Sequence, residues 1–446
     1  MKTNTAVKSP SVTTHEGGRA VAHQKPLQEL ERTVASCLLG EDTFYESGGS
    51  VKDRIFSLAQ NESPEAVSQV AIKARNKWRL RHAPLQLVLA MINTKQPKVV
   101  GLVAKTIFEV VQRPDEMGEL LAMYWKDGKK PLPSAMKKGL AKAFTKFDAY
   151  QLGKWNKDAA IKLRDVLFMV HAKPNDEQQA ATWKQLVDKT LPTPDTWEVA
   201  LSAGADKKET FERLITTKKM PYMALLKNLR NMVDAKVAHS IIKGALINGA
   251  EKSKALPFRY LSALRHAPSL AAEIEEAMLL SIKGNGVKLP GRTLIVVDVS
   301  GSMDSPLSDK SEVNRIAAAS ALAIMAREVC EECRVFTFST GLVEVPAFRG
   351  LGLVKGISDS QMHSGTDLQN SLRQLQGHAG VQPNDRVVVI TDEQSSSGAT
   401  CPWPKGYVLN VASYKPTLAL NQGWTRINGL SEQFIEWVTV EEGLDQ

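Results

Sequence analysis

Residues 292–303 read Arg-Thr-Leu-Ile-Val-Val-Asp-Val-Ser-Gly-Ser-Met, an apolar run that ends in the pattern Asp-x-Ser-x-Ser. Continuous apolar runs are typical of buried strands in parallel sheets, and ligands gather beyond the carboxyl ends of such strands. Asp298, Ser300 and Ser302 place oxygen ligands on the turn after this predicted strand, and oxygen ligands suit a hard cation such as Mg²⁺. The same residue types also cap helices and form Asx turns, so a plain turn is the alternative.

Two downstream segments favour a metal site over a plain turn. Thr366 precedes a helix-like stretch, and Asp392 ends the apolar run 386–392. Together with the first turn, these segments resemble the metal-ion-dependent adhesion site of von Willebrand factor A domains. The resemblance implies a divalent metal ion, with Mg²⁺ expected, and an open position for a partner's carboxylate. The implied ligands, some of them through water, are Asp298, Ser300, Ser302, Thr366 and Asp392.

The C-terminal third alternates strands and helices, which predicts an α/β doubly wound domain over residues 286–446. We expect strands at 293–298, 334–339, 386–391 and 406–412, a helix at 311–328 and another after Thr366. Cys330 and Cys333 form Cys-x-x-Cys, but the remaining two of the four cysteines are isolated and no second pair completes a zinc site. We therefore predict free thiols in a reducing compartment.

Charge is divided unevenly along the 446 residues. Residues 286–446 hold 13 basic and 18 acidic residues, a net charge of −5, which leaves 44 basic and 30 acidic residues, a net charge of +14, for residues 1–285. Such asymmetry favours a polyanionic partner, and nucleic acid is the commonest one in a cytoplasm. A merely solvated basic surface is the alternative.

The first part of the chain is predicted to be helical and repetitive. Leu85, Val88, Leu89 and Ile92 recur at helical spacing, and so do apolar residues from Val103 to Val110, with Pro97 between the two runs. Similar runs follow at 135–147, 159–170, 183–191, 197–201 and 207–216. Stacked helical hairpins of HEAT type fit this pattern.

The sequence does not indicate a membrane protein. No charge-free apolar run approaches the ~18 residues of a membrane span, and the polar first 25 residues lack the apolar core of a signal peptide. We expect a cytoplasmic protein with no membrane partner, and a flexible N-terminus over residues 1–15.

Basic residues lie beside aromatic ones within the predicted helices, as in proteins that stack bases and contact phosphates. Arg79 and Arg81 follow Trp78, and Lys154 and Lys157 flank Trp155, although both tryptophans fit a hydrophobic core equally well. The further candidate RNA-binding residues are Lys137, Lys138, Lys142, Arg164, Lys227 and Arg230.

Six segments resemble the TROVE module of the Ro autoantigen proteins and their bacterial relatives. They read TFYESG (43–48), ARN (74–76), RDVLFMVHAKP (164–174), TWE (196–198), MPYMALLKNLRNM (220–232) and LPFRYLSA (256–263). The resemblance covers roughly residues 15–440 and includes the von Willebrand factor A domain that follows. It implies a mainly α HEAT-like helical repeat ring over residues 16–285, closed by the α/β domain.

The resemblance also implies partners. Family members bind small noncoding Y RNA on the outer surface, and single-stranded 3′ ends of misfolded or structured RNA enter a central hole. Some bacterial relatives are tethered to polynucleotide phosphorylase, so this or another exoribonuclease is an expected partner. His171, which ends a helix in His-x-Lys-Pro, joins Lys154, Lys157 and Arg164 as an expected Y RNA contact, while Asp158 stands where the family has Arg.

We accordingly expect a non-enzymatic RNA-binding protein that acts in noncoding RNA quality control or decay. A two-metal nuclease needs more carboxylates than these loops supply. The alternative from another functional class is a metal-dependent protein-interaction scaffold that docks acidic peptides, and the +14 segment argues against it.

Overall fold

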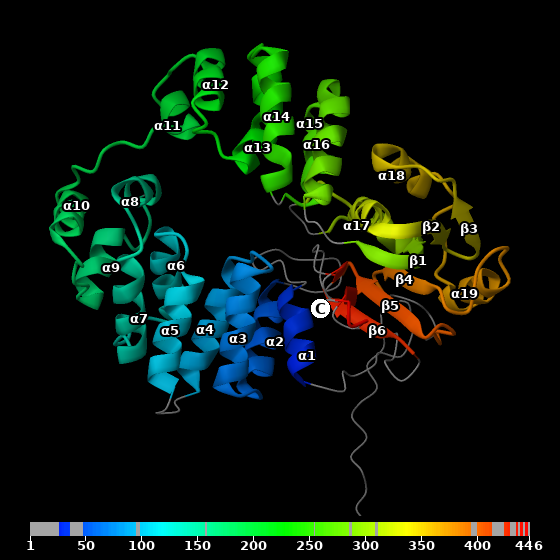
Figure 1. Ribbon diagram of the computed structural model, residues 1–446. Helices are drawn as coiled ribbons and strands as arrows, with labels where there is room; N and C mark the ends of the chain where they lie inside the picture. Colours follow the sequence, from blue (N-terminus) through cyan, green and yellow to red (C-terminus); the bar gives the residue numbers. More distant parts are fainter. Residues whose placement is uncertain are drawn as a thin grey trace, which may run out of the picture. The chain divides into compact units, whose positions relative to one another are not determined.

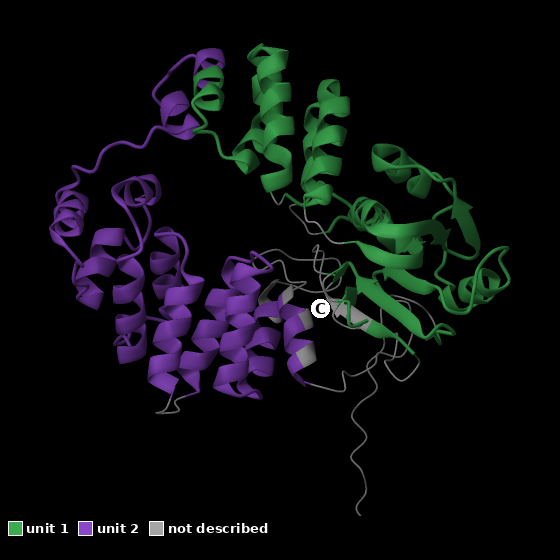
Figure 2. Ribbon diagram, in the orientation of Figure 1, with its two compact units in different colours: residues 1–24, 40–48, 211–446 green, residues 25–39, 49–210 purple. Residues whose placement is uncertain are grey.

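A computed structural model describes most of the chain (Figure 1). The described residues are 26–35, 48–94, 99–156, 158–253, 255–284, 288–307, 311–393, 399–412, 423–428, 434–435, 438–439 and 442–444. They divide into two compact units, which Figure 2 colours separately: residues 1–24, 40–48 and 211–446 form one, and residues 25–39 and 49–210 form the other. The predicted flexible segment 1–15 lies outside the described residues.

The unit of residues 25–39 and 49–210 is a stack of helices. Helices α1, α3, α5, α7 and α9 pack on one another in chain order, while α4 packs on α3, α5 and α6. The bounds are α1 Pro26–Ala35, α2 Gly48–Gln60, α3 Pro64–Asn76, α4 His82–Asn93, α5 Val100–Val110, α6 Asp115–Tyr124, α7 Ser134–Phe144, α8 Ala149–Trp155, α9 Leu163–Val170, α10 Glu177–Asp188 and α11 Trp197–Ser202. This arrangement agrees with the predicted helical repeats.

Sequence signals at the helix ends explain where several of these helices begin. Ser63 accepts a hydrogen bond from Ala66 N and Pro64 follows it at the first helical position, so α3 starts there. Asp148 and Gln151 form a capping box at α8, and Asp176 caps α10. The apolar residues that the helical spacing selects, including Leu85, Ile107 and Leu140, are fully buried in the core of this unit.

The other unit joins four helices to an α/β domain. Helix α12 (Lys207–Thr216) spans the division between the units, and α13 (Tyr222–Asp234), α14 (His239–Ser253), α15 (Pro257–His266) and α16 (Ala271–Lys283) follow. Helices α15 and α16 pack on α17 of the α/β domain, and Glu275 of α16 accepts a hydrogen bond from Leu351 N at 2.8 Å. The helical region is therefore shared between the two units. The predicted domain boundary at 285/286 falls on residues outside the described part, between α16 and the first strand.

Six strands form one sheet in the order β3-β2-β1-β4-β5-β6. Neighbouring strands are parallel except for β3, which pairs antiparallel with β2 at one edge. The bounds are β1 Leu289–Asp298, β2 Cys330–Phe338, β3 Leu342–Val345, β4 Arg386–Thr391, β5 Lys405–Asn410 and β6 Thr425–Asn428. From β1 the chain adds β2 and β3 on one side of the sheet and then β4, β5 and β6 on the other. The switch point of the sheet therefore lies between β1 and β4.

Helices cover both faces of this sheet, as the doubly wound prediction requires. Helix α17 (Arg315–Val329) packs on β1, β2 and β4. Leu368, Leu372 and Leu375 of α19 (Leu368–Gln376) share a separate core with Leu294 and Val296 of β1. Helix α18 (Gly350–Ser358) packs on α17 and β3. The predicted strands and both predicted helices are confirmed within a few residues, whereas the sequence patterns do not predict β3, α18 and β6.

A buried guanidinium ties the C-terminal residues to the amino ends of the strands. Arg386 of β4 donates to Glu442 through Nε at 2.5 Å and Nη2 at 2.7 Å, and its Nη1 donates to Thr293 Oγ1 at 2.8 Å. Lys405 Nζ also lies 2.6 Å from Glu442. Since Arg386 and Glu442 are both almost fully buried, each charge needs the other as its countercharge.

The described helices include none that is long and apolar enough to cross a membrane.

Candidate nucleic-acid interface and metal site

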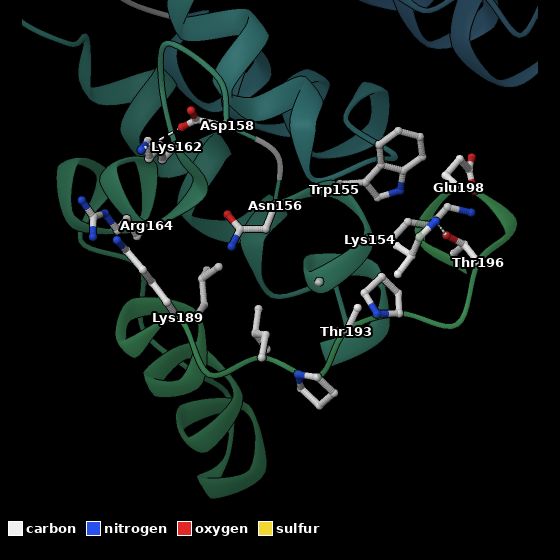
Figure 3. A pocket seen from close by; sticks show the side chains of 16 residues that line it. Lys154, Trp155, Asn156, Asp158, Lys162, Arg164, Lys189, Thr193, Thr196 and Glu198 are labelled. Atoms are coloured by element: carbon white, nitrogen blue, oxygen red, sulfur yellow. Dashed lines mark hydrogen bonds and ion pairs between the residues drawn. The ribbon is translucent and has the colours of Figure 1, made fainter. Parts of the chain in front are cut away.

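A cavity of about 570 Å³ opens between the end of α8, the start of α9 and the segment that joins α10 to α11 (Figure 3). Gly153 brings α8 close to that joining segment, because a Cβ atom there would lie only 3.0 Å from the Pro192 carbonyl oxygen. The polar and aromatic lining includes Lys154, Trp155, Asn156, Lys162, Arg164, Lys189 and Glu198. All of them belong to the unit of residues 25–39 and 49–210.

Four cationic side chains line this cavity. The sequence predicts Lys154 and Arg164, and the structure brings them together with Lys162 and Lys189, which the sequence does not single out. Lys157 lies outside the described residues. Lys189 follows α10 as its left-handed cap, and no aromatic neighbour in the sequence points to it. The cationic lining therefore comes from α8, α9 and the end of α10. The spacing of these residues in the sequence does not predict that they lie together.

Acidic neighbours weaken some of these charges. Asp158 forms an ion pair with Lys162 at 2.9 Å, and this pair lowers the pKa of the Asp158 carboxyl. Arg164 Nε lies 3.5 Å from Asp165 Oδ1, which is a looser pair. Because Asp158 offsets Lys162, an incoming anion meets mainly Lys154, Arg164 and Lys189. Asp158 therefore replaces the Arg that the resemblance implies and also offsets Lys162, and the lining keeps Lys154, Arg164 and Lys189.

Trp155 lines the cavity as a half-buried platform. The Arg113 guanidinium carbon lies 3.5 Å from the centre of its ring, and Lys154 Nζ lies 5.7 Å from it. Two hydrogen bonds to Asp115, at 3.1 and 2.5 Å, hold the Arg113 side chain. Cations over an indole face are attracted by its electron density, so the ring orientation is fixed before any ligand arrives.

Trp78 and Arg81 have structural roles. The Trp78 side chain is only 8% exposed and belongs to the core, which is the alternative that the sequence leaves open. Arg81 is partly buried, lies 2.9 Å from Asp115 Oδ2 and also pairs with Glu119. Arg79 is exposed, beside them in sequence. Arg81 is therefore committed to ion pairs within the helical unit.

The other predicted RNA-binding residues lie away from the cavity lining. Lys138 and Lys142 of α7 are exposed, Lys137 is partly buried, and Lys142 Nζ lies 4.8 Å from the Phe108 ring centre. His171 is exposed and ends α9 in the left-handed conformation. Lys227 and Arg230 are exposed on α13, opposite the buried Leu226 and Leu229, but α13 belongs to the other compact unit. The basic candidates thus form several patches.

The predicted metal turn lies at the carboxyl end of β1, beside the switch point of the sheet. Asp298 Oδ1 accepts from Ser300 N at 2.9 Å, and Ser300 Oγ lies 3.3 Å from Ser302 Oγ. Thr391 Oγ1 donates to Asp298 Oδ2 at 2.5 Å, which links the turn to the end of β4. Gly301 N donates to Ser364 O at 2.9 Å, so the loop that carries Thr366 reaches the same turn. The structure thereby gathers the three predicted segments.

Buried charge at this turn is strongly unbalanced. Asp298, Asp392 and Glu393 are all at most 1% exposed. Burial, together with the nearby Asp392 carboxylate, raises the pKa of Asp298 to about 7. Among the described residues, the buried cation paired with Asp392 is Arg315, which donates from Nη1 to Asp392 Oδ2 and to the Ser302 carbonyl, both at 3.0 Å.

This charge balance fits a divalent cation. Asp298 and Asp392 lie near one guanidinium, while Glu393 accepts a hydrogen bond from Asn410 Nδ2 at 3.0 Å, and the serine and threonine hydroxyls add neutral oxygen ligands of the kind that Mg²⁺ accepts. The sequence motif does not include Arg315, although an arginine that opens an alanine-rich helix, followed by a mostly apolar run up to Ala326, is an available signal.

The cysteines agree with the prediction of free thiols. Cys330, Cys333 and Cys401 are free, and Cys37 lies outside the described residues. Across the described part of the chain, no three His, Cys, Asp or Glu side chains gather in a way that would hold a metal ion. A site at the β1 turn must therefore draw on the hydroxyl groups of Ser300, Ser302 and Thr366.

The chain is similar to known proteins both in sequence and in fold. The family model of the TROVE domain matches residues 187–288. Telomerase protein component 1 of Mus musculus is 33% identical over 89 residues, which is 19% of this chain and 3% of that protein, and its Rattus norvegicus counterpart is 32% identical over 89 residues with the same shares. The chain thus spans a small fraction of the length of these relatives. The crystal structure of the Deinococcus radiodurans RO (RSR) protein superposes with a TM-score of 0.60 at 17% identity, over 94% of this chain and 100% of that one.

Proposed function

Since this chain is a Ro-like protein that carries a TROVE domain, we propose that it binds small noncoding RNA through the cationic cavity beside Trp155. RNA binding in general is supported by the family and the fold, in line with the resemblance found in the sequence. The observation that carries the specific proposal is that Lys154 and Arg164, which the sequence predicts as RNA contacts, line one cavity with Lys162, Lys189 and an aromatic platform.

The finer proposal is a Y-like RNA on the surface around this cavity. Phosphate groups of a folded RNA would contact Lys154, Arg164 and Lys189, because Lys162 is paired with Asp158 at 2.9 Å whereas Arg164 has only the looser contact with Asp165 at 3.5 Å. Single-stranded 3′ ends of misfolded RNA would use a separate site, and the exposed Lys138, Lys142, Lys227 and Arg230 supply further phosphate contacts. We propose a role in noncoding RNA quality control or decay, in which an exoribonuclease acts as the partner. Closure of the helical repeats into a ring, and action in the cytoplasm, stay predictions.

Salt dependence tests the RNA proposal. Filter binding with a hairpin RNA that bears a single-stranded 3′ tail should give log affinity that falls linearly with log salt, with a slope of about −3 to −6 if four to seven phosphates are contacted. The slope arises because each neutralised phosphate releases a counterion. A flat slope between about 50 and 200 mM salt, at any affinity, would contradict binding through these cations.

We further propose that Asp298, Ser300, Ser302, Thr366 and Asp392 hold a divalent cation, with Mg²⁺ as the expected ion. Hydroxyl ligands donate little charge, so a bound ion would remain electrophilic and could attract an acidic group of a partner. The unbalanced carboxyl charge at the turn supports this proposal.

Thermal unfolding with and without Mg²⁺ tests the metal site. Wild-type protein should gain about 2.7 kcal/mol at a Mg²⁺ concentration of about 100 times Kd, because the folded state alone binds the ion. Asp298→Ala should lose this response, while Asp359→Ala, which removes an exposed carboxylate of the same domain, should retain it. Absence of any Mg²⁺ response in the wild type would count against the site.

A further inference from the structure

A histidine links the candidate metal turn to the loop that carries Thr366. His363 lies three residues before Thr366, and its Nδ1 is 2.9 Å from each of the two carboxylate oxygens of Asp304. Asp304 ends the short 3-10 helix η3 (Gly301–Asp304), which contains Ser302. The His363–Asp304 pair, here called the clasp, therefore joins the two segments that supply these predicted metal ligands.

The surroundings of the imidazole require that it carry a positive charge. Its Nε2 lies 2.9 Å from the carbonyl oxygen of Ser358, so a carbonyl faces one ring nitrogen and a carboxylate faces the other. Both are hydrogen-bond acceptors. A neutral imidazole has one donor nitrogen and one acceptor nitrogen, whereas the imidazolium donates from both. Only the imidazolium satisfies both contacts, so the clasp is an ion pair.

Two acidic groups stabilise this charge. Among the described residues, the charged groups that face His363 are Asp304 of η3 and Asp359, which follows α18. Burial by itself lowers the pKa of His363, but the hydrogen bonds to Asp304 and Ser358 and the two carboxylate charges outweigh burial and raise this pKa. The stability that the clasp contributes is therefore complete below the ordinary histidine pKa of about 6.5, and it is lost as the pH rises through the raised pKa of the folded protein.

The loop 358–367 is attached to its surroundings on two sides. On the side of the sheet, the carbonyl oxygen of Ser339, which follows β2, accepts from Asp367 N at 2.8 Å. On the side of the metal turn, Gly301 N donates to Ser364 O at 2.9 Å. Ser364 is the residue after the clasp histidine, so the clasp holds the acceptor of this backbone hydrogen bond in place.

We propose that His363 and Asp304 are positioning residues of the metal site, and that their ion pair keeps the Thr366 loop on the turn before the ion arrives. This inference rests on the proposed metal site and adds control by a proton to it. Both residues act through the loop and not as ligands. A site that is already ordered saves the free energy of ordering the loop on binding, so the clasp should raise the affinity for Mg²⁺.

Hydrogen exchange tests the clasp in the metal-free protein. The Gly301 amide is the reporter because it donates to Ser364 O, and the Asp367 amide, bonded to Ser339 O, is the internal control. Between about pH 6 and pH 9 the protection factor of the Gly301 amide should fall about two- to fivefold, the range for a partly exposed ion pair, while that of the Asp367 amide stays constant.

Neutral variants assign this pH dependence to the clasp. His363→Gln keeps a donor amide without the charge, so the Gly301 amide should have the lower protection already at pH 6. Asp298 titrates in both proteins and contributes the same background. His378→Gln, which removes a histidine that contacts Arg334 in the same domain, should behave like the wild type. A wild-type pH dependence that persists in His363→Gln would overturn the clasp.

A double-mutant cycle tests whether the two residues act as a pair. At pH 6, His363→Gln and Asp304→Asn should each lower the Gly301 protection factor about two- to fivefold, and the double variant should lower it no further. Losses that multiply in the double variant would show that the residues act independently, and would overturn the clasp.

Mg²⁺ titration, followed by thermal unfolding, separates the positioning role from the metal site. His363→Gln should raise the Kd for Mg²⁺ about two- to fivefold at pH 6 and leave it unchanged at pH 9, where the wild type has also lost the clasp. Equal Kd values of the two proteins at pH 6 would overturn the positioning role while the metal site stands. Absence of a Mg²⁺ response in the wild type would overturn the metal site and the positioning role, and hydrogen exchange would still decide whether the clasp exists.

Discussion

Arg315→Met should lower the free energy of unfolding of the α/β domain by about 3–5 kcal/mol, the usual cost of removing one partner of a buried ion pair. Arg315 is 1% exposed and is paired at 3.0 Å with Asp392, which is fully buried. Without the guanidinium, the Asp392 carboxylate would face Asp298 with no countercharge. Hydrogen exchange of the β1 and β4 amides measures this loss locally, which avoids assuming that a chain of two units unfolds in one step.

Two further variants serve as comparisons for Arg315→Met. Arg327→Met removes an arginine from the same helix that donates to two carbonyl groups, at 3.1 and 3.3 Å, and we expect a loss of only about 1–2 kcal/mol. Adding Asp392→Asn to Arg315→Met should restore part of the stability, because the orphaned charge is then gone. A loss below about 1 kcal/mol in Arg315→Met would show that the pair is not what stabilises the turn.

Charge reversal at the cavity should have the largest effect on the affinity for RNA. Changing Lys154, Arg164 and Lys189 together to Glu should weaken binding of a folded small RNA by on the order of 1,000-fold or more at about 0.1 M salt, since three charged hydrogen bonds of about 1.5–3 kcal/mol each are lost and repulsion replaces them. The slope of log affinity against log salt should become shallower by about 2–3, in proportion to the phosphate contacts removed.

A matched triple variant separates the effect of the cavity residues on RNA binding from the effect of net charge. Lys184, Lys207 and Lys208 are exposed in the same compact unit and do not line the cavity, so changing them to Glu alters the total charge by the same amount. This control should cost about tenfold at most, since screening weakens charges that lie far from the bound RNA. Equal losses in the two triple variants would mean that the RNA senses overall charge, and the cavity would no longer define the binding site.

Patterns that repeat within one element are predictable from the sequence. The apolar run before Asp298 and the run 386–391 are long enough to identify β1 and β4, and the polar residues at their carboxyl ends identify the candidate metal site. Strands β3 and β6 are not predicted from the sequence, because each has four residues and lies at a sheet edge, where little apolar periodicity is needed. Short edge elements carry too few buried positions to leave a clear signal.

Contacts between distant segments are not predictable in the same way. Lys189 approaches Arg164 only because α9 and α10 pack together, and Arg315 meets Asp392 only because α17 crosses the switch point of the sheet. Trp78 and Trp155 have similar basic neighbours in the sequence, yet one is buried in the core and the other lines a cavity. Local composition does not distinguish the two, because burial depends on helices that are far away in the chain.

The Arg386–Glu442 pair has a consequence for biosynthesis. Arg386, Thr293 and the Pro290 carbonyl oxygen are joined through one guanidinium, whose carboxylate partner is supplied near the end of the chain. At about 5–20 residues per second, a ribosome needs about 3–11 s to travel the 56 residues from Arg386 to Glu442. During that interval the nascent α/β domain holds an uncompensated arginine where its sheet should close. We expect the growing chain to need protection from premature association until Glu442 has been added.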